Sequence, residues 1–512
     1  MKILRISSLL FLILVIGACA PDKDDLCDLK ISSSDNVIEK EFDWAVRKAL
    51  SCVMSGQTGV INSSENYGGE GDWQYISCYR AGLPYRSAFY VRDFCHQLSG
   101  AHLLGFDKEN TEMMEAFLLS VSRQRECYPL WSLNFDGSPY KPDYESDECF
   151  ARYVPAVFEL VEKLYSLYMW TGDKSLINNS RIWNAVSMMM EEFPDLHDSY
   201  IKDGIAEGST TGFVGDGLSS YCDYLNPLIE SGDGIASQYR AYLAYASLLE
   251  VRSEKTKAET YRSKAEEIKR HFEQEWVLDS AEDGFAYIRG LGLKAGKVGG
   301  FGFEGSVFIP LKGLAEPSAT TTEFLKSCDS AYESIGPDNV SISSLTYLPD
   351  LFFSWNMINA GWKWTKKINR LRFADHPLSL VGNNGNYPEV AFTYISNVVE
   401  NMLGFEPDAP HNSFSVISRL PDEIDRLGVE NIPLGRNLVS VLHEGRDCTT
   451  ICHEQGNREV RCTVRFYGSY EHISIDGTLF KATRETLRGI PVSSVSIKIP
   501  IGGSVKVKTV KD

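Results

Sequence analysis

Apolar residues recur at every third or fourth position through most of the first 410 residues, a spacing that predicts helices. The expected helices are Glu41–Met54, Asp93–Leu104, Glu109–Ser122, Phe150–Trp170, Ser180–Glu192, Ile235–Val251, Thr256–Val277, Ser318–Ser334, Asp350–Lys367 and Val390–Leu403. Gly105, Gly172 and Gly404 follow three of these runs, where glycine commonly ends a helix. The pattern therefore predicts a mainly α region of roughly ten to twelve helices.

Four long segments without this spacing lie between consecutive helix pairs: residues 124–147, 194–233, 278–304 and 371–388. Short turns alternate with them, so an array of paired helices would carry short turns on one face and long loops on the other. Loops longer than about 15 residues in a compact domain are usually functional. We therefore expect a site on the face that carries the long loops.

After residue 410 the pattern changes to short runs in which apolar and polar residues alternate, which favours strands. The expected strands are Phe414–Ser418, Asn437–His443, Val460–Tyr467, His472–Ile475, Val492–Ile499 and Val505–Val510. We expect a helical domain over residues 38–410, followed by a small β-sandwich over residues 411–512.

The N-terminus has the layout of a signal peptide. Lys2 and Arg5 precede the apolar run Leu9–Ile16, which is too short to span a bilayer. The run ends in Ile16-Gly17-Ala18-Cys19, which resembles the lipobox of bacterial lipoproteins. This resemblance implies removal of residues 1–18, a lipid on Cys19, a linker over residues 19–37 and a soluble remainder. The alternative is an ordinary signal peptide with a chance cysteine.

Asp22-Lys23-Asp24-Asp25 follows the cysteine closely. It resembles the acidic surface-export tags of Bacteroidetes lipoproteins, although a solvated linker has the same composition. We therefore expect a protein that the Cys19 lipid anchors to a bacterial outer membrane, at the cell surface or the periplasmic face.

The net charge of −18 argues against nucleic acid or anionic lipid as partners and is compatible with neutral carbohydrates. Of the twelve cysteines, eleven would remain after lipidation of Cys19, an odd number that cannot pair completely. They show no Cys-x-x-Cys spacing of the zinc-binding kind. We expect buried thiols with one or two disulfides, a monomer, and neither a metal nor an organic cofactor.

Arg92 and Asp93 are adjacent at the start of an expected helix. A fixed guanidinium beside a carboxylate can donate to and accept from a pair of sugar hydroxyls. The structural alternative is an Asp that interacts with the helix dipole and an Arg in a surface ion pair. His96 follows one turn later, where it could reach the same site or serve as a buried structural histidine.

A candidate general acid lies in the loop before residue 235, where Asp223 stands between Tyr221 and Tyr224. Aromatic neighbours would partly desolvate this carboxyl, raise its pKa and keep it protonated. An Asx-turn in a loop is the structural alternative. Asp216 and Glu230 are the nearest rivals for the role, and Glu304, between two glycines, is a further one.

A candidate general base, Glu389, follows Pro388 at the start of the last expected helix. Proline fixes the first turn, and the positive end of the helix dipole favours a negative charge there. A base needs that ionised form. A capping glutamate without a catalytic role would look the same in the sequence.

Together, the helix pairs, the long loops and these motifs resemble the six-hairpin glycosidases, whose fold is an (α/α)6 barrel, over about residues 38–410. Tyr90-Val91-Arg92-Asp93 is similar to the Trp-Pro-Arg-Asp segment of glucoamylase-like members, with Val91 in place of proline. Gln238-Tyr239-Arg240-Ala241 is similar to the Gln-His-Arg-Ala segment that follows their general acid. The resemblance implies sugar binding by Arg92 and Asp93.

The same resemblance implies that Asp223 is the acid and Glu389 the base. Asp147 and Glu148 stand before the helix expected to start at Phe150, near an acidic sugar-binding position of the family. Trp131 is the preferred stacking platform for a sugar ring, although tryptophan is more often part of the core.

The leading hypothesis is a glycoside hydrolase that acts on oligosaccharides or polysaccharides through two carboxylates, with inversion at the anomeric carbon as in glucoamylase-like relatives. A polysaccharide lyase or sugar epimerase on the same barrel is one alternative. A non-catalytic, glycan-binding surface lipoprotein is the other.

Overall fold

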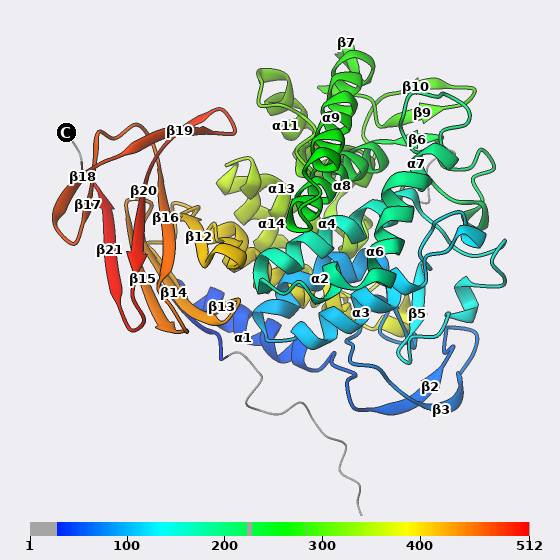
Figure 1. The fold of residues 1–512 in the computed structure, drawn as a ribbon, viewed down its shortest axis with the longest axis horizontal. Helices are drawn as coiled ribbons and strands as arrows, with labels where there is room; N and C mark the ends of the chain where they lie inside the picture. Colours follow the sequence, from blue (N-terminus) through cyan, green and yellow to red (C-terminus); the bar gives the residue numbers. More distant parts are fainter. Residues whose placement is uncertain (1–27, 223–227, 283, 511–512) are drawn as a thin grey trace, which may run out of the picture.

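The computed structural model describes residues 28–222, 228–282 and 284–510. Cys19, the acidic segment after it and Asp223 therefore lie outside the described residues. Figure 1 shows a large helical body with a sheet-rich C-terminal region at one side of it. The expected change from helices to strands is confirmed.

A closed series of helices forms the centre of the helical body. Among the described residues, α2 packs against α4, α4 against α8, α8 against α10, and α10 against α13. A π-helical turn, Asn397–Met402, extends α15 and packs against α13, while α15 itself packs against α2. The helices of the series are α2 (Val91–Leu103), α4 (Val154–Thr171), α8 (Gly232–Val251), α10 (Glu304–Leu311), α13 (Tyr347–Ser354) and α15 (Pro388–Ser396).

Further helices cover this series from outside. They are α1 (Asn36–Leu50), α3 (Asp107–Leu119), α6 (Ser180–Ser187), α9 (Lys255–His271), α11 (Ala319–Ile335) and α14 (Ile358–Leu371). The pair α8 and α9 shows why the two sets differ. α9 buries the single stripe Ala258, Tyr261, Ala265 and Ile268, whereas α8 is buried around most of its circumference. A single apolar stripe is typical of a surface helix, and burial all round of an inner one.

Each expected helix overlaps an observed one, although several bounds differ by four or five residues, as in α1 (Asn36–Leu50) against the expected Glu41–Met54. The segment expected to form one helix over 350–367 is split between α13 and α14, because Asn356 has a left-handed backbone with φ of 56°. The short helix α10 was not expected, since it follows a glycine-rich segment. The helix expected from Phe150 begins only at Val154.

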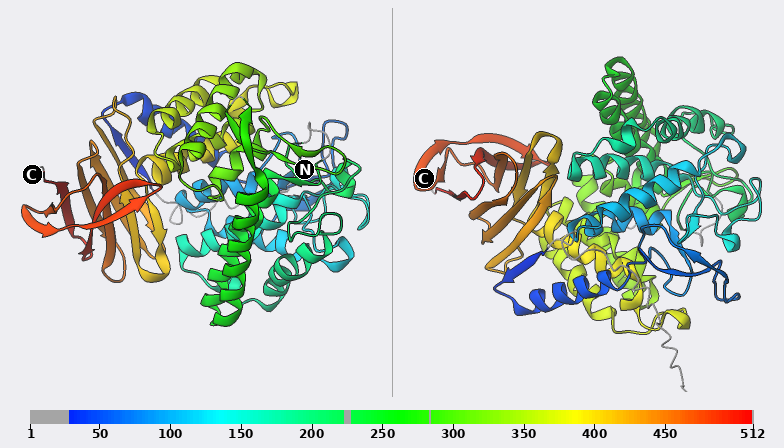
Figure 2. Two further views of the ribbon diagram at one scale, coloured as in Figure 1. Left: turned by 90° about the horizontal axis from the view of Figure 1, so that it is seen from above. Right: turned by 60° about the horizontal axis from the view of Figure 1, so that its bottom comes forward.

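Two sheets form the C-terminal region. The first has the strand order β1-β13-β14-β15-β21-β17-β18, and the second β11-β12-β16-β20-β19. Figure 2 shows both sheets at the same side of the helices. Their strands are β1 (Lys30–Ser33), β11 (Glu406–Asp408), β12 (Ser413–Ile417), β13 (Arg426–Leu434), β14 (Asn437–Glu444), β15 (Cys448–Gln455), β16 (Val460–Tyr467), β17 (His472–Ile475), β18 (Thr478–Lys481), β19 (Thr483–Leu487), β20 (Ile490–Ile499) and β21 (Ser504–Thr509).

The alternation read in Val460–Tyr467 corresponds to real burial, because Val460, Cys462, Val464 and Phe466 face the core. The segment expected to be a linker contains β1, which pairs antiparallel with β13. The C-terminal sheet therefore includes residues that precede the first helix.

The expected buried thiols are confirmed, and the expected disulfides are not found among them, since these described cysteines are buried and free: Cys52, Cys78, Cys95, Cys127, Cys328 and Cys462. Within the described ranges, no helix combines the length and the apolar character needed to cross a bilayer.

Candidate active site

The first turns of several central helices meet at one end of the closed series. Arg92 on α2 donates from Nη2 to Oε1 of Glu304 on α10, at 2.9 Å, and from Nε to the hydroxyl of Tyr347 on α13, at 3.4 Å. The chain therefore brings together helix starts that lie more than 200 residues apart. The positive end of each helix dipole favours acidic side chains at such positions.

Aromatic rings and a carboxylate hold the Arg92 side chain. Its guanidinium carbon lies 5.5 Å from the ring centroid of Tyr221 and 5.4 Å from that of Tyr347, within the range of a cation–π contact. Glu304 also accepts a 2.6 Å hydrogen bond from the Ser344 hydroxyl. Arg92 and Glu304, both singled out from the sequence, thus form one buried pair.

Asp93 is buried beside the same pair and accepts a hydrogen bond from the hydroxyl of Tyr387. Burial and the nearby Glu389 carboxylate raise the pKa of Asp93 to about 7, although the Tyr387 hydrogen bond and Arg92 oppose the rise. Asp93 and Glu389, which are 296 positions apart in the printed sequence, therefore belong to one electrostatic cluster.

Glu389 is fully buried in the first turn of α15, directly after Pro388. Its Oε1 accepts a 2.5 Å hydrogen bond from Nδ1 of His96. Its Oε2 accepts no hydrogen bond from any described residue. Buried polar atoms are hydrogen-bonded in the great majority of cases, so this oxygen can accept from a partner outside the chain, such as water or a ligand.

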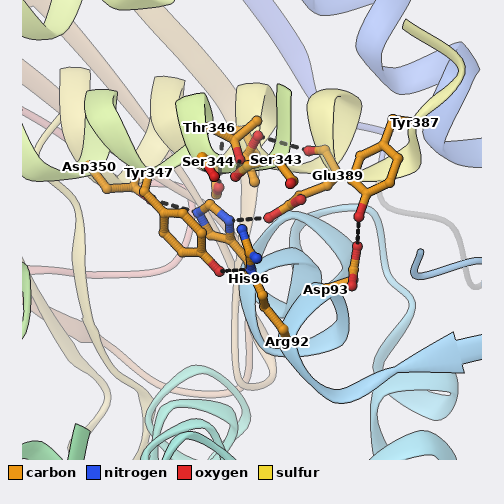
Figure 3. Close-up of polar contacts among 12 residues, drawn as sticks. Arg92, Asp93, His96, Ser343, Ser344, Thr346, Tyr347, Asp350, Tyr387 and Glu389 are labelled. Atoms are coloured by element: carbon orange, nitrogen blue, oxygen red, sulfur yellow. Dashed lines mark hydrogen bonds and ion pairs between the residues drawn. The ribbon is translucent and has the colours of Figure 1, made fainter. Parts of the chain in front are cut away.

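The second ring nitrogen of His96, Nε2, lies 2.9 Å from Oδ2 of Asp350 on α13 (Figure 3). The imidazole also stacks on Tyr347, with ring centroids 3.9 Å apart and planes 2° from parallel. Burial lowers the pKa of His96, but the hydrogen bonds to Asp350 and Glu389 outweigh it and raise the pKa to about 9. Both nitrogens therefore carry protons at neutral pH and donate to carboxylates.

The segment just before Asp223 is anchored next to this cluster. Tyr221 donates from its hydroxyl to Oε2 of Glu159 at 2.8 Å, and from its backbone nitrogen to Oδ2 of Asp233 at 2.7 Å. Burial raises the pKa of Asp233 to about 6. Sequence reasoning missed Asp233, although it stands in the first turn of α8, the same kind of position as Asp93 and Glu389.

Trp131 lies at the edge of the site. Its ring is 4.3 Å from Tyr153 and 5.7 Å from Tyr221, measured between centroids. It is partly buried against the core, so it forms part of an aromatic wall beside Arg92. Its expected role in stacking on a sugar stays a prediction.

The remaining acidic candidates lie elsewhere in the fold. Asp216 is exposed and accepts a hydrogen bond from Thr211. Glu230 is buried, with neither carboxylate oxygen bonded to a described residue. Burial and the charges of the nearby loop acids raise the pKa of Glu230 to about 9.

Asp147 and Glu148 do not start a helix, because α4 begins six residues after Glu148. Asp147 pairs with Arg125 at 2.5 Å and accepts from the Tyr144 hydroxyl at 2.8 Å. Glu148 is exposed and accepts from the Ser146 hydroxyl. These contacts explain both residues as loop anchors, and their expected role in sugar binding stays a prediction.

No known family model and no curated protein matches the sequence. Solved structures do match. The α-L-rhamnosidase from Dictyoglumus thermophilum aligns with 95% of this chain at a TM-score of 0.59 and 12% identity. The Streptomyces avermitilis α-L-rhamnosidase complexed with L-rhamnose aligns with 95% at 0.59 and 11% identity. A putative kojibiose phosphorylase from the human microbiome aligns with 93% at 0.54 and 9% identity.

The chain spans 51% and 42% of the lengths of those two rhamnosidases, and 67% of the phosphorylase. At identities this low the likeness shows a shared fold alone. The chain therefore shares the fold of these three enzymes.

Proposed function

We propose that the protein is a glycoside hydrolase in which Glu389 activates the attacking water. The observation that carries this proposal is the Glu389 carboxylate. One oxygen is bonded to His96, and the other is free of described partners next to Arg92 and Asp93. A carboxylate held at one oxygen can take a proton from water at the other.

The same packing supports an (α/α)6 barrel. The central helices contact one another in a closed cycle, and most of them have an outer helix packed against them. In such a barrel the central helices run in the same direction, so their first turns gather at one end. The carboxylates of α2, α8, α10 and α15 would then surround a single sugar-binding funnel.

Arg92 and Asp93 would bind hydroxyls of the sugar on the non-reducing side of the bond that is cleaved. Arg92 has five N–H donors, and its contacts with Glu304 and Tyr347 use two of its nitrogens. Further donors of the same guanidinium are thus available for a vicinal diol. Glu304 already accepts from Arg92 and Ser344, which supports a role in fixing Arg92 over a role as the acid.

We propose Asp223 as the general acid. The support is the anchoring of Tyr221, two residues before it, against Arg92, Glu159 and Asp233. Asp233 is the second candidate, because its pKa is about 6 and its Oδ1 accepts no hydrogen bond from a described residue. The variants Asp223→Asn and Asp233→Asn decide between them. Loss of turnover should follow the true acid and be relieved by substrates with an activated leaving group.

The lyase and epimerase alternative requires a Tyr or His that accepts a proton. His96 is the histidine at this site, but a ring that is protonated below about pH 9 and donates to two carboxylates is a poor base. Phosphorolysis is a further alternative, because a putative kojibiose phosphorylase shares the fold. It requires a phosphate anion at the position of Glu389. Two negative groups at that point would repel each other. Hydrolysis is therefore the reaction that these side chains support best.

The experiment uses the soluble protein that begins after Cys19, the Glu389→Gln variant, and a panel of oligosaccharides with α-L-rhamnosides first, with and without inorganic phosphate. Proton NMR follows the released sugar. Release of sugar by the wild type but not by Glu389→Gln supports hydrolysis. The first anomer seen distinguishes inversion from retention. Equal activity of the two proteins would refute the role of Glu389. Dependence on phosphate would indicate a phosphorylase, and binding without turnover a glycan-binding protein.

We also propose that Cys19 carries the lipid anchor at the outer membrane. The signal-like segment and the Ile16-Gly17-Ala18-Cys19 motif support it. Expression of the full chain with a labelled fatty acid should give a labelled protein, and Cys19→Ala should give an unlabelled, soluble one. Label on the Cys19→Ala variant would contradict the assignment.

A further inference from the structure

We infer that His96 and Asp350 are positioning residues for Glu389: Asp350 orients the His96 ring, and the ring holds Oε1 of Glu389 so that Oε2 faces the attacking water. This inference rests on the proposed function. Neither residue has to touch the sugar for it to hold.

The first support is the geometry of the ring. Nδ1 lies 2.5 Å from Glu389 and Nε2 lies 2.9 Å from Asp350, so opposite edges of the imidazole are each fixed by a carboxylate. The parallel stack on Tyr347 fixes its plane. A ring restrained at both nitrogens and on one face has a single orientation, and it passes that orientation to Glu389.

The second support is that the restraint is itself anchored. Oδ1 of Asp350 accepts a 2.6 Å hydrogen bond from the amide of Asn401, so both oxygens of Asp350 are bonded. Tyr347 and Asp350 are three residues apart on α13 and therefore project from one face of the helix. A single rigid helix thus supplies the stack and the carboxylate together.

The two carboxylates bonded to His96 have different surroundings. His96 and Asp350 line a polar cavity of about 210 Å³, and Glu389 is not among its lining residues. The side chain of Asp350 is 27% exposed, whereas that of Glu389 is fully buried. The charged groups that share this cavity with His96 are Glu159, Glu162, Lys163, Lys312, Asp350 and Glu400.

Carboxylates outnumber cationic groups around the ring. Lys312 is bonded at 2.6 Å to both Glu159 and Glu162, which leaves Asp350 and Glu389 as the carboxylates bonded to His96 itself. Arg92, which lies on α2 with His96, donates its hydrogen bond to Glu304 and not to these carboxylates. The imidazolium therefore has a carboxylate at each nitrogen, and the group of three stays negative, which favours the protonated ring.

Two substitutions of His96 separate the two hydrogen bonds. The amide nitrogen of an asparagine reaches about as far as Nδ1 of histidine, and that of a glutamine about as far as Nε2. His96→Asn should therefore keep the donor to Glu389, and His96→Gln should keep the donor to Asp350. A loss of orientation at the base should lower kcat about 100-fold in His96→Gln with little change in KM. His96→Asn should retain at least ten times the kcat of His96→Gln, a difference that a bulk packing defect would not produce.

The experiment measures kcat and KM on the sugar that the panel identifies, for wild type, both His96 variants and Glu389→Gln. A second readout needs no turnover. In protein labelled with ¹⁵N-histidine, the ring signals assigned to His96 by their absence from His96→Asn should show two protonated nitrogens at pH 7. In Asp350→Asn the titration of that ring should move to lower pH, because an amide removes the charge but can still accept a hydrogen bond.

Equal kcat for His96→Asn and His96→Gln would overturn the inference, and so would a singly protonated ring in the wild type at pH 7. If Glu389→Gln stays active, the proposed function fails and the positioning role fails with it, even where the ring signals agree with the structure. If Glu389→Gln is inactive and the His96 variants match the wild type, only the positioning role fails.

Discussion

Arg92, in the first turn of α2, donates a 2.9 Å hydrogen bond to Glu304, the first residue of α10, and both side chains are largely removed from solvent. The pair joins two helices of the closed series that do not contact each other as neighbours in the cycle. It therefore spans the end of the helical body at which the candidate site lies.

The variant Glu304→Ala should lower the free energy of unfolding by about 3–5 kcal/mol, because it leaves a buried guanidinium without its carboxylate. Glu304→Gln should cost less, since an amide oxygen can still accept from Arg92. Urea unfolding measures both. Glu323→Ala is the control, because the Lys326–Glu323 pair is exposed and should contribute less than about 1 kcal/mol. Equal costs for Glu304→Ala and Glu323→Ala would show that the buried pair does not stabilise the site.

The pH dependence of activity should reflect the ionisation of Asp93. Its pKa is raised to about 7, so the ionised form that accepts from a sugar hydroxyl is complete only above that pH. The value of kcat/KM should therefore rise with pH through about 7. Tyr387→Phe removes a hydrogen bond that lowers this pKa and should move the rising limb to higher pH.

The control for this shift is Tyr394→Phe, which removes a hydroxyl farther along α15, beside Asn369. Its pH profile should match that of the wild type. If the rise of kcat/KM with pH has the same midpoint in Tyr387→Phe as in the wild type, Asp93 does not set that midpoint.

The raised pKa of Asp93 also predicts how stability depends on pH. A carboxyl whose pKa is raised on folding favours the folded state at low pH, and that contribution is lost as pH rises through about 7.

Much of the candidate site could be predicted from the sequence because its acids stand in the first turns of helices. Arg92, Asp93 and Glu389 are singled out by such positions together with the resemblance to six-hairpin glycosidases, and the structure brings all three together. Asp233 and Asp350 also stand in first turns, but no such motif marks them. Their partners depend on packing between distant segments. Nothing near Asp350 in the sequence shows that it lies on the far side of His96, and the helix break at Asn356 disrupts the periodicity there.

Dependence on packing also explains where the fold differs from the pattern-based expectation. α10 is short and begins after Phe303, whose φ of 46° is uncommon for a residue with a side chain, so its segment has the composition of a loop. β13 contains Gly428 and Pro433 and carries a bulge, which interrupts its alternation. Helix positions followed from periodicity, whereas short or irregular elements depend on contacts that only the folded chain supplies.

Glu230 predicts a different pH dependence of stability. Its pKa rises from an ordinary value of 4.5 to about 9 through burial and nearby acids. The folded protein therefore holds this proton more tightly than the unfolded chain, and the resulting stabilisation is lost as pH rises from about 4.5 to about 9. Relative to Glu230→Gln, the free energy of unfolding of the wild type should fall by up to about 1.4 kcal/mol for each pH unit in that window.

Chemical unfolding of both proteins at pH 5, 7 and 8.5 tests this expectation. Parallel curves for the two proteins would contradict it. Glu230→Gln should also retain turnover if Asp223 is the acid, so the same variant examines a rival assignment. Loss of turnover without loss of stability would instead identify Glu230 as a catalytic residue.

The close approach of α2 and α15 gives a final prediction about how the site is assembled. A Cβ added at Gly100 would lie 2.2 Å from the backbone oxygen of Phe392, so Gly100→Ala must push the two helices apart. These helices carry the His96–Glu389 and Asp93–Tyr387 hydrogen bonds, and a small displacement would misalign both. We expect a loss of about 1–3 kcal/mol of stability from overpacking and a fall in kcat of about 100-fold. Gly299→Ala, whose added Cβ would meet Leu278 at an ordinary 3.5 Å, should change neither. If Gly100→Ala loses stability while kcat is retained, the spacing of the two helices serves packing alone, and the contacts between them tolerate the shift.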